Sequence, residues 1–145
     1  MGRMCKCTFG PGRNGDTCGM SEQPVRFPIR FGALQPLLVL VGLTPRRCYA
    51  EVGPDAVRVR MSWSFRADVP RAAIRSAHRL HDERWSIGVH GWRGRWLVNG
   101  ARGPLVSLAI APPAHASVLG IRVRLRELIV SVDEPDALVA ALPPR

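Results

Sequence analysis

The chain has 145 residues, enough for one domain with a hydrophobic core of its own. Hydrophobic residues make up 46% of the sequence and charged residues 22%, which excludes an intrinsically disordered chain. The formal net charge of +10 predicts attraction to polyanions at low salt. Every basic residue except Lys6 is arginine, a bias that GC-rich genomes produce, so the charge alone does not establish a polyanion as the partner.

Residues 1–24 are predicted to form a disordered N-terminal extension, because the segment 1–19 has almost no apolar content and no periodicity. Met20 offers an alternative natural start. Three of the four cysteines lie in this extension, at Cys5, Cys7 and Cys18. One residue separates the first two, whereas zinc ligands usually have about two to four between them, so we expect no metal and no cofactor. A single domain is predicted at 25–145.

From residue 25 onward, short apolar runs alternate with turn residues, which is typical of an all-β domain. Strands are predicted at 25–32, 36–43 and 47–53. An alternative interpretation of the apolar run 33–43 is a targeting signal, although Pro36 interrupts it and it is far shorter than the ~20 residues of a membrane helix. A buried strand is the favoured interpretation.

The segment 56–69 carries the clearest pattern, because apolar and polar residues alternate along it. The apolar series is Val57, Val59, Met61, Trp63, Phe65 and Ala67. A period of two over this length predicts a half-buried antiparallel strand, or two strands joined by a bulge. Trp63 and Phe65 should then face the core.

The next segment, 70–85, predicts a short helix followed by a loop, because Pro70 suits a first helical position and small apolar residues recur near helical spacing. On such a helix His78 and His81 share a face, with the acidic pair 82–83 close behind. A metal site would need a third ligand, for which His90 or His115 would serve. The simpler interpretation is a polar loop after a helix end, so no metal or catalytic site is expected.

The glycine-rich stretch 88–100 predicts a β-hairpin with a two-residue turn at Arg93-Gly94. Trp92 then pairs with Arg95, and Gly91 with Trp96. Trp96 falls on the apolar face of the hairpin, together with Trp85, Ile87, Val89 and Val98. Trp92 falls on the other face, near the exposed tip and beside two arginines.

Three more elements complete the chain. A strand is predicted to begin at 104 and to end at Pro112-Pro113. A second strand covers 120–132, and its apolar phase shifts near Arg126-Glu127, which predicts a bulge or a bend. A short helix covers 133–142, with Asp133 as its cap. Its inward-facing residues are Leu138, Val139 and Leu142.

About seven antiparallel strands followed by one short C-terminal helix is the element order of a small PH-like β-barrel or sandwich. The closing segment LIVSVDEPDALVAAL resembles the last strand and C-terminal helix of bacterial, especially actinobacterial, PH-like proteins of unknown function. The resemblance covers about residues 25–142 and implies a module that binds or scaffolds. Eukaryotic relatives that bind inositol lipids carry a basic motif in the first hairpin loop. Here no basic residue lies between Arg30 and Arg46, which argues against that ligand.

Arginines on the strand faces are the main binding candidates. One set belongs to 56–69, one to the hairpin tip and one to 120–132. The candidate residues are Arg58, Arg60, Arg66, Trp92, Arg93, Arg95, Arg122, Arg124 and Arg126. If the strand faces adjoin, carboxylates or a bound anion must offset their repulsion. A merely solvated face is the plain alternative.

These observations predict a non-enzymatic, cytoplasmic binding or scaffold module that recognises a protein partner or an anionic surface through its arginine-rich exterior. A basic nucleic-acid-binding β-domain is the alternative. It is weakened by the expected burial of Trp63 and Phe65, because RNA-binding modules stack bases on exposed aromatic rings. A metal-dependent enzyme that uses His78 and His81 is the third interpretation. The sequence contains no P-loop, nucleophile elbow or dinucleotide fingerprint.

Overall fold

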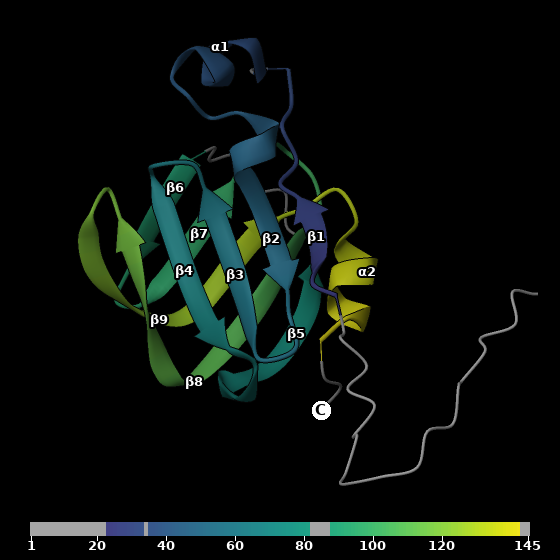
Figure 1. Cartoon of the computed structure of the whole chain (residues 1–145), viewed down its shortest axis with the longest axis vertical. Helices are drawn as coiled ribbons and strands as arrows, with labels where there is room; N and C mark the ends of the chain where they lie inside the picture. Colours follow the sequence, from purple (N-terminus) through teal and green to yellow (C-terminus); the bar gives the residue numbers. More distant parts are fainter. Residues whose placement is uncertain (1–22, 34, 82–87, 143–145) are drawn as a thin grey trace, which may run out of the picture.

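A computed structural model of the chain describes residues 23–33, 35–81 and 88–142 (Figure 1). The predicted N-terminal extension as far as residue 22, with Met20 and three of the cysteines, lies outside the described residues. The same holds for the acidic pair 82–83 and for Trp85 and Ile87.

Nine β-strands and two α-helices form the described part of the chain. The strands are β1 (Val25–Pro28), β2 (Cys48–Val52), β3 (Ala56–Met61), β4 (Phe65–Pro70), β5 (Ile74–Leu80), β6 (Gly88–Trp92), β7 (Arg95–Asn99), β8 (Leu105–Val118) and β9 (Ile121–Ser131). The helices are α1 (Gln35–Leu40) and α2 (Pro135–Ala140), and two 3-10 turns are η1 (Pro45–Arg47) and η2 (Arg71–Ala73). The predicted mainly-β class with a short C-terminal helix is confirmed.

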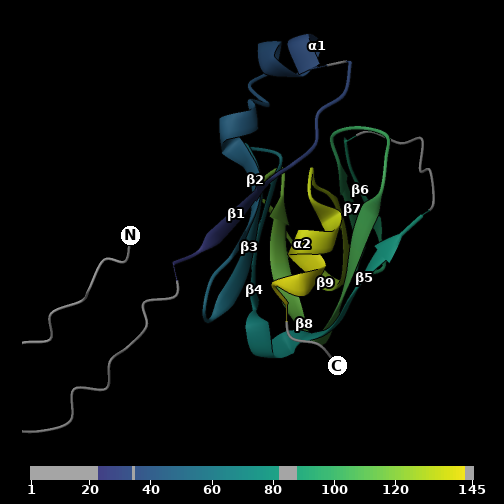
Figure 2. The same ribbon diagram turned by 90° about the vertical axis from the view of Figure 1, so that its right-hand side faces the viewer.

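The strands form two facing layers that share the long β8–β9 hairpin (Figure 2). The order of hydrogen-bonded neighbours is β1-β2-β3-β4-β8-β9-β7-β6, and β5 also pairs with β8. The C-terminal half of β8 pairs with β4, and its N-terminal half pairs with β5. One strand therefore belongs to both layers, and α2 lies between them on one side.

The sheet differs from the predicted antiparallel barrel in two respects. It is open, with β1 and β6 at the ends of the strand order, and a bridge between Ile29 and Val132 links the end of β1 to the end of β9. Its β7–β9 pair is parallel. Since β9 lies between β7 and β8, which run in opposite directions, it cannot be antiparallel to both.

The alternating segment 56–69 forms a hairpin, with strands β3 and β4 joined by a turn at residues 62–64. The predicted apolar phase is confirmed, because its strand residues are buried between the layers. Trp63 is the exception. It lies in the turn and is 55% exposed, so its predicted core position is wrong. Alternation assigns a face only while the chain stays extended, and Ser62 turns it with a φ of 49°.

The prediction of a buried strand at 36–43 is wrong. Residues 35–40 form α1, and none of them is buried. The pairing of Pro28 with Tyr49 brings β1 and β2 together and leaves the intervening chain as an excursion from the sheet. Within it, Pro36 occupies the first helical turn, where its missing N–H costs nothing, and Gly42 ends the segment with a φ of 84°. Figure 1 shows α1 projecting from the end of the sheet.

The helix predicted at 70–85 is also wrong as far as the segment is described. Pro70 ends β4, η2 makes a turn, and Ile74–Leu80 forms β5. The segment forms a strand because it pairs with the edge of β8, from Ile74 opposite Ile110 to Leu80 opposite Leu105. Pairing along a long neighbouring strand satisfies the backbone and overrides a weak helical periodicity.

The β6–β7 hairpin has the predicted register, with Trp92 opposite Arg95 and Gly91 opposite Trp96. Arg93 and Gly94 form the turn, with φ angles of 51° and 90°. Trp92 is 76% exposed, and Trp96 packs partly buried against the core. The indole of Trp96 occupies the space that a Cβ atom at Gly91 would need, so this glycine is required by packing.

The last three elements agree with the predictions in outline. Strand β8 continues through Pro112-Pro113 to Val118, so its predicted end is wrong. The irregularity predicted near Arg126-Glu127 is confirmed, although the extra residues lie on β8, between Ala109 and Ala114. Helix α2 begins at Pro135 with Glu134 as its N-cap, one residue later than predicted. Its inner residues Leu138 and Leu142 are buried.

Candidate functional site

The outer face of strands β1–β4 carries two rows of side chains, each formed by directly paired residues on neighbouring strands. The paired row consists of Arg26, Glu51, Arg58 and Asp68. The open row consists of Tyr49, Arg60, Arg66, Ser117 and Arg122, and it continues across β8 onto β9. The two rows share strands β2, β3 and β4 but differ in their balance of charge.

The paired row alternates in sign and is closed by ion pairs. Glu51 accepts from Arg26 Nε at 2.6 Å and from Arg58 Nη1 at 3.2 Å, and its side chain is buried beneath these guanidinium groups. Arg58 also lies 3.6 Å from Asp68. The hydrogen bond from Arg26, aided by Arg58, lowers the pKa of Glu51, although burial opposes the shift. The carboxylate of Glu51 therefore links strands β1, β2 and β3 through its ion pairs.

The positive charge of the open row is neutralised only in part by carboxylates. Arg60 reaches diagonally to Asp68, with both carboxylate oxygens within 2.8–2.9 Å of Nη2, and it donates to Ala67 O. Arg66, directly opposite Arg60, forms no ion pair with any described residue. The guanidinium of Arg26 stacks over Tyr49 at 4.4 Å from the ring centre. Positive charge therefore accumulates toward Arg66.

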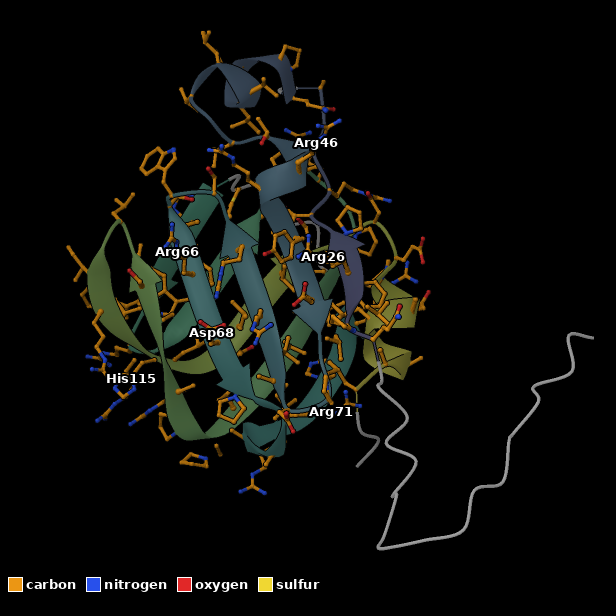
Figure 3. All side chains as sticks on the ribbon, in the orientation of Figure 1. Arg26, Arg46, Arg66, Asp68, Arg71 and His115 are labelled. Atoms are coloured by element: carbon orange, nitrogen blue, oxygen red, sulfur yellow. The ribbon has the colours of Figure 1, made fainter. Side chains whose placement is uncertain are left out.

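An open concavity of about 480 Å³ lies at the α1 end of this face, and we call it the Trp63 pocket. It is lined by Arg26, Arg46, Arg47, Tyr49, Arg60, Ser62, Trp63 and Arg66. Figure 3 shows Arg26, Arg46 and Arg66 on this side of the molecule, from β1, η1 and β4. The tip of the β3–β4 turn is fixed by hydrogen bonds from Trp63 Nε1 to Val41 O and from Ser62 Oγ to Gly42 O, at 3.0 and 2.8 Å.

A second concavity of about 630 Å³, the hairpin pocket, is lined by Arg93, Gly94, Trp96, Val123, Arg124 and Arg126. It forms because the tip of the β6–β7 hairpin docks on the irregular part of β9, where the amides of Arg126 and Glu127 both donate to Gly94 O. Arg95 pairs with Glu127 at 2.8 Å, and Glu127 accepts from Ser107. The three arginines that line this pocket, Arg93, Arg124 and Arg126, have no carboxylate partner among the described residues.

The candidate residues therefore separate into groups. Arg58, Arg60 and Arg95 are used in ion pairs. Arg66 lines the Trp63 pocket, and Arg93, Arg124 and Arg126 line the hairpin pocket. Arg122 lies at the β9 end of the open row, and Trp92 is exposed but lines neither pocket.

Six residues that line the Trp63 pocket were missed from the sequence: Arg26, Arg46, Arg47, Tyr49, Ser62 and Trp63. The first four belong to elements on either side of the misassigned run 36–43, and Trp63 was assigned to the core. The sequence signal that could have revealed them is the basic dipeptide Arg46-Arg47, which follows closely after the apolar run 36–43.

The histidine hypothesis loses its geometric basis. His78 lies on β5 and His81 directly follows the strand, so the two do not share a helix face as the hypothesis required. In the residues that the structure describes, no three histidine, cysteine or acidic side chains are grouped so as to hold a metal ion. Cys48 is buried, and the loss of hydration raises the pKa of its thiol to about 11, so at neutral pH it is not a thiolate.

Comparisons of the chain with protein-family models, with curated proteins and with solved structures gave no match. In the part of the chain that is described, no helix is long and apolar enough to cross a membrane. The site is therefore interpreted from its own geometry and charge.

Proposed function

We propose that this protein is a non-enzymatic binding module that recognises an anionic partner through the arginines of the Trp63 pocket, the open row and the hairpin pocket. The resemblance of the closing segment to bacterial PH-like proteins implies a module that binds or scaffolds, which supports the proposal. We propose a cytoplasmic site of action.

The observation that carries the proposal is the unequal use of carboxylates. Seven arginines on these surfaces have no ion-pair partner among residues 23–33, 35–81 and 88–142. They are Arg46, Arg47, Arg66, Arg93, Arg122, Arg124 and Arg126. Their mutual repulsion opposes folding, and a bound anion would relieve it and gain charge-assisted hydrogen bonds.

Nucleic acid is the second candidate, because one observation favours it. Trp63 and Trp92 are both exposed and both lie beside arginines, so each could stack a base while a guanidinium contacts phosphate. The sequence argument against this ligand was the expected burial of Trp63 and Phe65; Phe65 is buried, but Trp63 is exposed.

The test uses two labelled probes of equal charge, a polyphosphate and a single-stranded DNA of about 20 phosphates, titrated at several salt concentrations. If about three phosphates are contacted, affinity should fall about 20-fold between about 50 and 200 mM salt. Replacing Arg46, Arg47 and Arg66 together by Gln should weaken binding at least about tenfold. Affinity that does not change with salt would overturn the proposal.

Arg75→Gln is the matched control for Arg66→Gln alone, because each removes one charge and Arg75 lies on β5 in the other layer. It should change affinity less than about twofold. A loss as large as that of the pocket arginines would mean that net charge, and not the pocket, drives binding. Tighter binding of DNA than of polyphosphate, lost on Trp63→Ala, would select nucleic acid as the partner.

A further inference from the structure

We infer that the anionic partner is a lipid bilayer with anionic headgroups, and that α1 and Trp63 insert into its interface while the arginines of the Trp63 pocket contact the headgroups. This inference rests on the proposed function and names the partner of the same site.

The apolar residues of α1 and of the chain just after it are turned to solvent. Leu37 is 59% exposed, Leu40 82% and Val41 52%. Isolated apolar side chains on a surface need no explanation, but a contiguous apolar protrusion does. Figures 1 and 2 both show α1 beyond the end of the two layers, so these side chains cannot be covered by the sheet.

Two turns of the sheet add to this apolar end. Trp63 in the β3–β4 turn contacts the α1 excursion through its hydrogen bond to Val41 O. The β8–β9 turn lies beside it, because Leu119 N donates to Ser64 O at 2.9 Å, and Leu119 is 61% exposed. Between them is an apolar hollow of about 190 Å³, lined in part by Leu43, Met61 and Val118. An amphipathic indole at the base of an apolar protrusion is the arrangement that membrane interfaces favour.

Among the described residues that line the Trp63 pocket, every charged side chain is an arginine. Arg46 and Arg47 follow the apolar run 36–43 after two residues, and Arg66 faces the same pocket. The sequence from 23 to 50 contains no acidic residue. Each arginine near an anionic membrane strengthens binding, so neither the short apolar protrusion nor the arginines would need to anchor the protein alone.

A lipid bilayer accounts for both the apolar protrusion and the arginines around it, whereas the other polyanions account only for the arginines. Aliphatic side chains such as Leu37 and Leu40 do not stack on bases, so a nucleic acid would leave them in water. A folded protein partner would need a groove shaped to α1. A fluid lipid interface needs no such shape and accepts a protruding apolar turn surrounded by cations.

The experiment measures cosedimentation of the full chain with vesicles of phosphatidylcholine alone and of phosphatidylcholine with about 30% phosphatidylserine, alongside the polyphosphate titration. Binding should require phosphatidylserine. Leu37→Ser with Leu40→Ser should weaken vesicle binding at least about tenfold and leave polyphosphate binding within about twofold. Brominated lipid should quench the tryptophan fluorescence of the wild type, and Trp63→Phe should lose most of that quenching.

A matched pair of valines controls for exposed apolar area. Val41, at the α1 end, is 52% exposed, and Val25, at the start of β1, is 51% exposed. Val41→Ser should weaken vesicle binding several-fold and Val25→Ser should not. Circular dichroism of each variant confirms that the sheet is retained.

The outcomes separate the two proposals. Polyphosphate binding without vesicle binding, or vesicle binding that does not respond to the α1 variants, overturns the membrane inference and leaves the proposed function intact. Equal binding to both vesicle types also overturns it, because the arginines would then have no part in it. A chain that binds neither probe overturns both.

Discussion

The paired row and the open row lie side by side on one sheet face, and they use the same residue type for different purposes. In the paired row, arginine alternates with carboxylate across β1–β4, and Glu51 is buried beneath two guanidinium groups. In the open row, Arg60 takes its counter-charge from the neighbouring row, and Arg66 has none among the described residues. The arginines of such a surface therefore differ in their roles. Those paired with carboxylates stabilise the sheet, and those without a carboxylate partner are available to a ligand.

The largest expected effect on stability comes from Glu51. Glu51→Gln leaves Arg26 and Arg58 adjacent without their shared carboxylate, and we expect the free energy of unfolding to fall by about 2 kcal/mol at neutral pH. Urea denaturation at constant salt measures it. Asp68→Asn is the comparison, because its carboxylate is exposed and should cost about 0.5 kcal/mol. Equal losses from both variants would contradict the distinction between buried and exposed counter-charges.

The stabilisation by Glu51 should depend on pH. Its pKa in the folded chain lies below the ordinary value of 4.5, mainly because of the hydrogen bond from Arg26. The unfolded chain therefore takes up the proton first as pH falls, so this stabilisation is present above pH 4.5 and is lost as pH falls through the lowered pKa. The difference in stability between wild type and Glu51→Gln, measured by denaturation from pH 7 to pH 3, should shrink toward zero. A difference that stays constant would contradict the ion pairing.

A smaller effect separates the two rows directly. Arg58→Gln should lower the free energy of unfolding by about 0.5–1 kcal/mol, because it removes a partner of Glu51. Arg66→Gln should change it by less than about 0.5 kcal/mol, and in the stabilising direction, because Arg66 only repels Arg60 across the strand pair. Thermal and urea unfolding of both variants test this. A substantial destabilisation by Arg66→Gln would mean that Arg66 has a structural partner.

Elements with strong local patterns were predictable from the sequence. The register of β6–β7 follows from a turn that needs positive φ at Arg93-Gly94, and the faces of β3 and β4 follow from a period of two. Helix α2 follows from a proline in the first turn and from apolar spacing, although its N-cap is Glu134 and not Asp133. Each of these signals lies within a few residues of the element it defines.

Elements decided by distant parts of the chain were not predictable. Ile74–Leu80 is a strand because β8 offers an edge, and 35–40 is a helix because β1 and β2 pair on either side of it. The Trp63 pocket depends on both that excursion and the position of one turn. Period two placed Arg58, Arg60 and Arg66 on the outer face, but it could not show which of them Glu51 and Asp68 would neutralise.

The most direct test of the account compares the salt dependence of polyphosphate binding for Arg66→Gln and Arg58→Gln. Both variants lose one positive charge from the same sheet face, on adjacent strands. If Arg66 is available to the ligand and Arg58 is committed to carboxylates, the slope of log affinity against log salt should fall by about 0.7 for Arg66→Gln and stay unchanged for Arg58→Gln. Equal slopes for the two variants, or a loss confined to Arg58→Gln, would contradict the assignment of the open row to binding.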